Sequence, residues 1–580
     1  MKKIEPIRHS LSHIMAQAVL ELSPKTKLGM GPAIENGFYY DFQFTKPLQE
    51  NDLAKIESKM EEIINQDQKF SKKNITKLVA KKLFKDQPYK LELIKELPGK
   101  TVSIYTNTGS LYEFTDLCKG PHIKNTKEIN PKAFKLTRIA GAYWKGDEKN
   151  KMLTRIYGLA FETEKELMDY LKMLEEAEKR DHRVLGKKLD LFCFSDLVGP
   201  GLPLFTPKGT SIKEELQKEV EKICRKYGFE KVSTPHLAKI ELYEISGHAK
   251  KFSDELFHVS SAKKHNFVMK PVQCPHQTQI YASKPRSYRD LPIRYMESEK
   301  QYRAEKAGEV GGLTRVYAIT CEDGHIFCTK EQVKNEIKTL VSIIRDFYTS
   351  MGLWENHWVS LSTRGKDFSK YIGEKKDWDL CEKILQEVSD EMNLNAKKCP
   401  GEAALYGPKL DFMFKDALGK EVQIPTVQID FATPKKFNLT YIDQDGKEKN
   451  PVMVHRAILG SYERFLALII EHYAGAFPVW LSPVQVAVIP ISEKHDSYAK
   501  GVEKQLKNSL IRVELKNQNE TLGKKIRESE MQKIPYLLVI GDKEISANTV
   551  SIRERGKGDI GAMDIEKFVE KIKQEVINKK

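Results

Sequence analysis

The order of predicted strands and helices changes after Pro483, and this change limits the possible folds of the 580-residue chain more than any other feature. Between about residues 185 and 482, strand-like runs such as LPIRYMES and EVQIPTVQIDF lie in neighbouring groups. That order predicts an α+β domain with a largely antiparallel sheet. Beyond Pro483, strands and helices alternate over about 95 residues, which predicts a small α/β domain with a mainly parallel sheet.

A third region precedes these two domains. Its first helix is predicted over IRHSLSHIMAQAVLEL, where apolar residues recur at helical spacing. Short strands and helices follow up to about Tyr157. The highly charged segment 163–183 predicts a connecting helix and a domain boundary near residue 180. The sequence therefore predicts a multidomain α+β protein with domains at 1–182, 183–482 and 483–580.

Composition and charge narrow the class of protein. The chain has 96 Lys and Arg against 81 Asp and Glu, a net charge of +15, which fits a polyanionic partner and a basic proteome about equally well. The longest apolar run, FLALII, is far too short to span a membrane, and no apolar segment follows the basic start. Eight cysteines in a chain of this length do not form a disulfide framework. We therefore expect a cytoplasmic protein without a membrane segment.

Two cysteine–histidine patterns could bind a metal. His9 and His13 share one face of the first helix, and the segment DLCKGPH adds Cys118 and His122. Imidazole and thiolate suit zinc, but the same groups could instead position a water for hydrolysis. The segment TCEDGHIFC resembles half of a zinc site around His325, although its spacing does not match a zinc knuckle and no fourth ligand is evident.

Four arginines in strand-like surroundings, Arg294, Arg303, Arg315 and Arg464, are candidates for phosphate binding. Arg303 and Arg315 lie on either side of a glycine-containing loop, so their guanidinium groups could bind a triphosphate together. Arg464 opens an apolar helix. The chain has neither GxxxxGK[ST] nor GxGxxG after a strand, so any use of ATP must occur without a P-loop or a Rossmann fingerprint.

A dense series of longer segments resembles one family over nearly the whole length. These segments, in order, include HSLSHIMAQAV, ENGFYYDF, DLCKGPHI, AGAYWKGD, SYRDLPIR, YGPKLDF, TVQIDF and VMVHRAILGSYERF. The chain resembles the bacterial threonyl-tRNA synthetases, which are class II enzymes. The resemblance implies an editing domain with its linker helix at 1–182, a class II catalytic domain at 183–482 and an anticodon-binding domain at 483–580. Many bacterial members carry a ubiquitin-like domain before the HxxxH helix, at which this chain begins.

The resemblance also implies the residues of the catalytic site. One Zn²⁺ per subunit would be held by Cys274, His325 and His455, which leaves a coordination position open for threonine. Threonine would be activated by ATP with Mg²⁺ to threonyl-adenylate, and the threonyl group would then be transferred to the 3′ end of tRNA(Thr). The implied catalytic residues are Arg303, Glu305, Asp323 and Arg464, and the further ATP-site residues are Arg315, Gln423, Gln428 and Ser461. The implied threonine pocket contains Asp323, Tyr406, Lys409 and, in place of a glutamine of the family, Cys321.

Two further sites follow from the resemblance. A site that requires a hydroxyl rejects valine by about 10⁴–10⁵, whereas the methyl group absent from serine is worth only about 1–3 kcal/mol. Mischarged seryl-tRNA(Thr) therefore has to be hydrolysed at an editing site, for which the family residues are His9, His13, Lys90, Asp116, Cys118 and His122. We interpret these as groups that position water and substrate rather than as a second zinc site. The implied anticodon contacts are Asn519, Glu544 and Arg553.

Several neighbours of the implied catalytic residues depart from the family pattern. Where the family commonly has NCPGH, this chain has QCPHQ. The family segment HRNE is YRAE in this chain, and the family segment RGFTQDDAH is YAITCEDGH. We expect an active homodimeric ligase, paired through the segment near Pro235, with an altered rim of the pocket. Two alternatives remain: an RNA-binding regulatory protein without ligase activity, and a hydrolase that acts mainly on mischarged tRNA.

Overall fold

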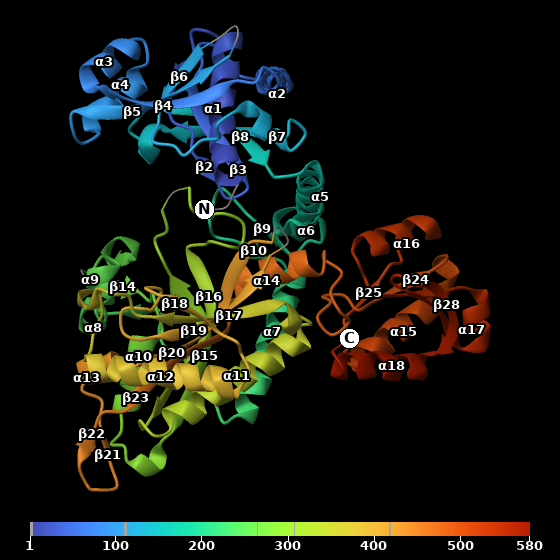
Figure 1. Cartoon of the computed structure of the whole chain (residues 1–580). Helices are drawn as coiled ribbons and strands as arrows, with labels where there is room; N and C mark the ends of the chain where they lie inside the picture. The colour runs from blue at the N-terminus through green and yellow to red at the C-terminus, as the bar shows by residue number, and fades with distance from the viewer. Residues whose placement is uncertain (1–3, 110–112, 264, 307, 417–418, 580) are drawn as a thin grey trace. The chain divides into compact units, whose positions relative to one another are not determined.

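The computed structural model describes residues 4–109, 113–263, 265–306, 308–416 and 419–579 (Figure 1). The chain divides into two compact units, Met1–Glu175 and Glu176–Lys580, and each is described by itself. In the parts of the chain that the structure describes, no helix combines the length and the apolar character needed to cross a membrane. All eight cysteines are unpaired, as expected for a chain without a disulfide framework.

The first unit contains two sheets. Helix α1 (Ile4–Leu22), the predicted first helix, packs on β3 and on α2 (Glu50–Asn65). The larger sheet has the order β1-β3-β8-β7, with β2 paired to β3; its strands are β1 (Lys27–Leu28), β2 (Ala33–Ile34), β3 (Gly37–Gln43), β7 (Phe134–Tyr143) and β8 (Met152–Ala160). The smaller sheet is β4 (Lys69–Thr76), β5 (Thr101–Thr108) and β6 (Glu113–Leu117), with α3 (Lys77–Leu83) and α4 (Pro88–Glu96) beside it.

Helix α5 (Glu164–Arg180) is the predicted connecting helix, and the division between the two compact units falls within it. Its acidic first turn and basic last turn match the helix dipole. The short helix α6 (His182–Lys188) follows directly, with Asp181 as its N-cap.

The second unit is built around an eight-stranded sheet of order β11-β15-β16-β23-β20-β19-β17-β18. The strands are β11 (Glu230–Lys231), β15 (Ile293–Tyr302), β16 (Ala318–Cys328), β17 (His357–Thr363), β18 (Lys397–Pro400), β19 (Lys409–Lys415), β20 (Glu421–Asp430) and β23 (Val452–Ser461). All pairs are antiparallel except the two at the edges, β11 with β15 and β17 with β18. The prediction of a largely antiparallel sheet is confirmed.

Helices bury the apolar side of this sheet. The helices are α7 (Pro207–Lys226), α11 (Val333–Ser350), α12 (Lys375–Glu391) and α14 (Tyr462–His472). α11 and α14 present stripes of buried residues to β20, β23 and β16, and together they form the largest core of the protein. Smaller elements cover the strand ends: α8 (Ile240–Ser246), α9 (His248–Lys251), α10 (Cys274–Ala282), α13 (Ala432–Lys436) and the sheet β12-β14-β13 (Leu237–Ala238, Asn266–Met269, His258–Ser260).

The C-terminal sheet has the order β25-β24-β26-β27-β28 and is mixed. β25 (Val513–Leu515), β24 (Val486–Pro490) and β26 (Tyr536–Ile540) are parallel, with α15 (Asp496–Asn508) and α16 (Leu522–Met531) between them in sequence. β27 (Thr549–Glu554) and β28 (Gly558–Asp564) run antiparallel, and α18 (Ile565–Ile577) closes the chain. The predicted mainly parallel sheet is therefore only partly correct. The single short helix α17 (Asp542–Ala547) between β26 and β27 leaves too little chain for a parallel crossover.

Candidate functional site

The register of two central strands brings two histidines together in the second unit. β16 and β23 pair so that His325 lies opposite His455, and their rings are 4.8 Å apart. Cys274 joins them from the first turn of α10, and one ligand atom from each of the three residues lies within 4.8 Å of the others. All three residues are buried. We call this group the Cys274 cluster.

The outer contacts of the Cys274 cluster leave the inner faces of both imidazole rings free. His325 Nδ1 is 2.7 Å from Gln277 Oε1, and His455 Nε2 is 3.0 Å from Asp430 Oδ2. His325 Nε2 is buried and has no hydrogen-bond partner among the residues that the structure describes, the condition expected of a nitrogen that ligates a metal. A carbonyl or carboxylate behind each ligating histidine is the usual support of a zinc site. One thiol and two imidazoles therefore fit zinc with an open fourth position.

Gln277 allows a test of this support. In Gln277→Leu the acceptor for His325 Nδ1–H is lost, so the ring orientation and tautomer are no longer fixed. We expect zinc affinity to fall by about 10- to 100-fold. Competition with a chromophoric chelator measures this affinity. Gln279→Leu is the matched control, because Gln279 lies on the same helix but is exposed. Equal zinc affinity of both variants and wild type would contradict the role of Gln277.

Polar groups line the space beside the Cys274 cluster. Asp323 lies two residues before His325 on β16. Its burial is the main reason why its pKa is raised to about 6. The Tyr406 ring is 5.3 Å from the ring of His455. Tyr406 and Arg303 both line a cavity of about 230 Å³. The implied threonine-pocket residues Asp323 and Tyr406 thus both lie near the Cys274 cluster, and Tyr406 also lines the cavity that Arg303 reaches.

The other implied pocket residues come from β19 and β20. Lys409 and Gln428 are register partners, and Gln428 is also opposite His455 on β23. Lys409 Nζ lies 2.8 Å from Asp411 Oδ2, and Gln423 donates to Asp411 Oδ1 at 2.6 Å. Through these contacts, polar side chains of β19 and β20 lie side by side on the sheet next to His455.

Arg303, which lines the cavity, forms a cationic group with Arg315 and Arg464. Desolvation lowers the pKa of Arg464, and the neighbouring charges of Arg303 and Arg315 lower it further. Arg315 Nε donates to Glu305 at 2.7 Å, whereas Arg303 makes only long contacts, 3.4 Å to the Pro271 carbonyl and 3.5 Å to Gln301. Three cations that repel one another in this way are suited to a polyanion such as a triphosphate.

The same strands account for the remaining implied residues of the site. Ser461 ends β23 and caps α14 by accepting from the backbone N–H of Arg464 at 3.2 Å. Cys321 lies opposite Ser461 in the β16–β23 register, and its carbonyl accepts from Gln273 Nε2 at 3.4 Å. Burial raises the pKa of the Cys321 thiol, so this residue offers the pocket a neutral sulfur.

The half zinc site suggested by TCEDGHIFC is not formed. Cys328 is fully buried in the hydrophobic core, and the donors that approach His325 come from α10 and β23 instead. Sequence spacing could not reveal these partners, because they lie 51 residues before and 130 residues after His325. The supporting residues Gln277 and Asp430 were also missed, although Asp430 lies just two residues beyond Gln428.

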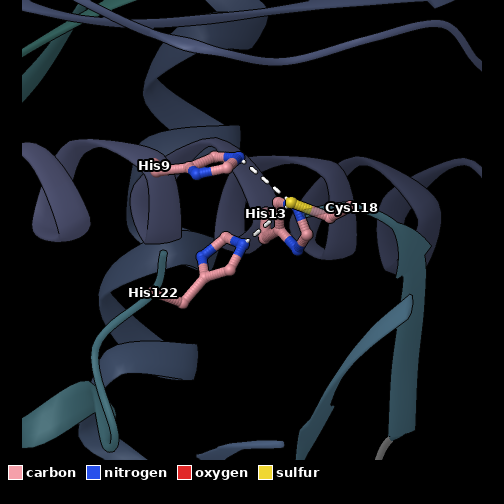
Figure 2. Close-up of side chains that lie close together, drawn as sticks. All are labelled: His9, His13, Cys118 and His122. Atoms are coloured by element: carbon pink, nitrogen blue, oxygen red, sulfur yellow. Dashed lines mark hydrogen bonds between the residues drawn. The ribbon is translucent and has the colours of Figure 1, made fainter. Parts of the chain in front are cut away.

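In the first unit, the two motifs HxxxH and DLCKGPH meet (Figure 2). Cys118 Sγ lies 3.3 Å from His9 Nε2 and 3.2 Å from His122 Nε2, and His13 lies beside them. The outer nitrogens of two rings make hydrogen bonds. His9 Nδ1 lies 3.1 Å from the Pro121 carbonyl oxygen, and His122 Nδ1 lies 3.0 Å from the Ser10 hydroxyl. We call these four side chains the His9 cluster. Their donor atoms lie within 4.8 Å of one another, so both interpretations, metal and water positioning, are compatible with the geometry.

A buried ion pair adjoins the His9 cluster. Lys90 Nζ lies 2.6 Å from Asp116 Oδ1, and both side chains are 2% exposed. Tyr40 donates to Asp116 at 2.5 Å and accepts from Lys90 at 2.9 Å. Burial lowers the pKa of His9, His13 and His122, so these rings are neutral at neutral pH and can accept hydrogen bonds. The structure thus gathers all six residues of the implied hydrolytic site.

The implied anticodon residues lie on three elements of the C-terminal domain. Asn519 is exposed in the bend after β25, Glu544 lies in α17, and Arg553 lies in β27. Glu544 accepts from the backbone N–H of Gly541 at 2.9 Å, and Arg553 lies 4.0 Å from Glu530.

Three family models match the chain. The model described as tRNA synthetase class II core domain (G, H, P, S and T) matches residues 257–473. The anticodon binding domain matches residues 485–575. The threonyl and alanyl tRNA synthetase second additional domain matches residues 102–157, which include Asp116, Cys118 and His122.

Relatives similar over almost the whole chain bear one name. Threonine–tRNA ligase of Rubrobacter xylanophilus is 46% identical over 98% of this chain and 88% of its own length. The ligase of Thermus thermophilus is 44% identical over 97% of this chain and 87% of its own length. The ligase of Thermotoga maritima is 44% identical over 99% of this chain and 88% of its own length. The RNA binding domain of threonyl-tRNA synthetase from Cryptosporidium parvum is a similar solved structure, with TM-score 0.65, 35% identity, and coverage of 68% of this chain and 98% of that one.

Proposed function

The chain belongs to the threonine–tRNA ligases, and from that premise we propose that Cys274, His325 and His455 hold one Zn²⁺ at the threonine site. When bound, the ion supplies a Lewis acid with an open position for the hydroxyl and amino groups of threonine. The observation that carries this proposal is the buried, unpartnered His325 Nε2 that faces the other two ligands. Asp323 and Tyr406 border the amino acid there, and Cys321 forms part of the rim.

The arginines bind and orient ATP in this proposal. Arg303 holds the α-phosphate next to the threonine carboxylate, and Arg315 and Arg464 hold the outer phosphates with Mg²⁺. As the carboxylate oxygen attacks and pyrophosphate leaves, negative charge grows on the phosphate oxygens, where fixed guanidinium donors stabilise it. Glu305, Gln423, Gln428, Ser461 and Lys409 complete the polar lining of the nucleotide and threonine pockets.

ATP–pyrophosphate exchange with threonine, serine and valine, combined with zinc content, tests the proposed activation site. We expect exchange with threonine, weaker exchange with serine, no detectable exchange with valine, and one zinc per chain. A folded chain with one zinc and no exchange with any amino acid would contradict it. Two zincs per chain would contradict the proposed role of the His9 cluster in positioning water.

The proposed editing site is the His9 cluster with Lys90 and Asp116. The enzyme edits mischarged tRNA, and the neutral imidazoles can accept a hydrogen bond from the water that attacks the seryl ester and so hold it in position. Lys90 and Asp116, with both charges buried and paired, hold the neighbouring polar groups of the substrate in place. Hydrolysis in the first unit removes the serine that the activation site cannot exclude.

His122→Ala is expected to slow hydrolysis of seryl-tRNA(Thr) by about 100-fold, because one of the rings that positions water is lost. Deacylation of purified seryl-tRNA measures the effect, and threonine-dependent exchange should stay at the wild-type rate. His258→Ala is the matched control, because His258 is exposed on β13 in the other compact unit. Unchanged deacylation in the His122 variant would refute the assignment.

We further propose a cytoplasmic homodimer that reads tRNA(Thr) with Asn519, Glu544 and Arg553. The pairing segment near Pro235 is the one that the resemblance to class II enzymes implies, and the matched anticodon binding domain, residues 485–575, contains the three residues. A solution mass near 66.6 kDa, that of one chain, would contradict the dimer. An unchanged KM for tRNA after replacement of all three residues would contradict the anticodon contacts.

A further inference from the structure

His182 joins three segments of the second unit that are distant in sequence. It is the first residue of α6 and only 6% exposed. The backbone N–H of Leu313 donates to His182 Nε2 at 3.2 Å, so Nε2 is unprotonated. Nδ1 therefore carries the proton, and it donates to Glu471 Oε1 at 2.7 Å. The His182 backbone N–H also points to Glu471 Oε1, at 3.3 Å.

The loop that His182 contacts is the one that carries Arg315. Gly311 and Arg315 exchange two backbone hydrogen bonds, of 3.1 and 3.4 Å, so Leu313 lies in the turn of a small closed loop. Gly312 adopts φ +52°, and a Cβ there would lie 2.3 Å from His182 Nε2. Only glycine allows this close approach. Because the loop is closed by its own bonds, fixing Leu313 also fixes the backbone of Arg315.

Glu471, on the other side of His182, belongs to the helix that carries Arg464. Both residues lie in α14, Arg464 near its start and Glu471 near its end. Arg464 Nε itself donates to the Thr314 carbonyl at 3.3 Å. The loop is thus attached to α14 at two neighbouring residues, at Thr314 directly and at Leu313 through His182.

We propose that His182 is a positioning residue for ATP binding: it holds the loop of Arg315 at a fixed distance from the helix of Arg464. This inference rests on the proposed assignment of these two arginines to ATP. His182 does not touch the substrate. It acts through Leu313 and Glu471. In its neutral tautomer, Nε2 accepts the hydrogen bond from Leu313 and Nδ1–H donates to Glu471.

Two amide replacements separate the halves of the bridge. The amide of His182→Gln reaches the place of Nε2 and can accept from Leu313, whereas that of His182→Asn reaches only the place of Nδ1. Glu471→Gln keeps an acceptor for Nδ1–H, and Glu471→Leu removes it. Arg183→Gln is the control, because Arg183 is exposed and its side chain pairs with Asp181. The full-length chain is assayed by ATP–pyrophosphate exchange at saturating threonine, with thermal unfolding measured in parallel.

We expect His182→Asn, His182→Gln and Glu471→Leu, each of which breaks one half of the bridge, to raise the KM for ATP by roughly 3- to 10-fold, the worth of one hydrogen bond, with kcat within about twofold of wild type. The KM for threonine should not change. Glu471→Gln, which keeps an acceptor for Nδ1–H, should leave the KM for ATP within about twofold of wild type.

A purely structural role would give a different pattern. If His182→Asn and His182→Gln lower the unfolding temperature equally and leave the KM for ATP unchanged, the inference is overturned. A rise in the KM for ATP in Glu471→Gln as large as that in Glu471→Leu also overturns it. Failure of the proposed function is distinguishable, because wild type and the Arg183 control would then lack exchange as well.

Discussion

Replacement of Arg303 by glutamine is expected to lower ATP–pyrophosphate exchange with threonine by about 10²–10³-fold, the usual cost of one transition-state donor. Arg303 directly follows strand β15, and its guanidinium makes long contacts to Pro271 and Gln301. Its remaining donors reach the cavity that Tyr406 also lines. The loss should appear in kcat, because negative charge on the phosphate grows as pyrophosphate leaves.

The variants around Arg303 separate charge from fold. Arg303→Lys keeps the charge but loses the bidentate fork, so an intermediate rate is expected. Arg289→Gln is the control, since Arg289 is exposed and its Nε contacts only the neighbouring Tyr288 ring hydroxyl. Zinc content and unfolding temperature should be unchanged in all three variants. Exchange by Arg303→Gln within about threefold of wild type would rule out the proposed contact with the α-phosphate.

Sequence patterns predict the architecture of this protein well where the local order of strands and helices alone decides the type of sheet or helix. Neighbouring strand runs gave the antiparallel sheet from β15 to β17, and the charged segment 163–183 gave α5. The error in the C-terminal sheet arose where the rule depends on loop length. Strand and helix alternate up to β26, but the short connection through α17 turns the next strand back instead of crossing over.

The sites are less predictable than the fold, because their residues meet only through strand register. Cys118 and His122 lie four residues apart and signal a site locally. His325 and His455 do not, since their proximity depends on the pairing of β16 with β23. Cys328 is close to His325 in sequence, but its apolar surroundings indicate a core residue, and alternation along β16 directs its side chain into the core. Only the family resemblance linked Cys274 with the two histidines before the structure was considered.

Replacement of Cys274 by serine is expected to remove the zinc and to reduce threonine-dependent exchange by about 10³–10⁴-fold. A serine hydroxyl is a poor zinc ligand at neutral pH, and two imidazoles alone bind weakly. Without recognition of the hydroxyl, threonine loses the advantage that separates it from valine. Zinc content by mass spectrometry and exchange with both amino acids measure the two effects. Cys399→Ser, which removes a thiol outside the cluster, should behave as wild type.

The two compact units make this last prediction specific to the Cys274 cluster. The residues of the proposed editing site lie within Met1–Glu175, and Cys274, His325 and His455 lie within Glu176–Lys580. Cys274→Ser should therefore hydrolyse seryl-tRNA(Thr) at the wild-type rate, whereas His122→Ala should lose hydrolysis and keep exchange. Zinc retained by Cys274→Ser, or full exchange in a zinc-free chain, would exclude the metal-based selection of threonine. Loss of both activities in either variant would mean that the two sites do not work independently.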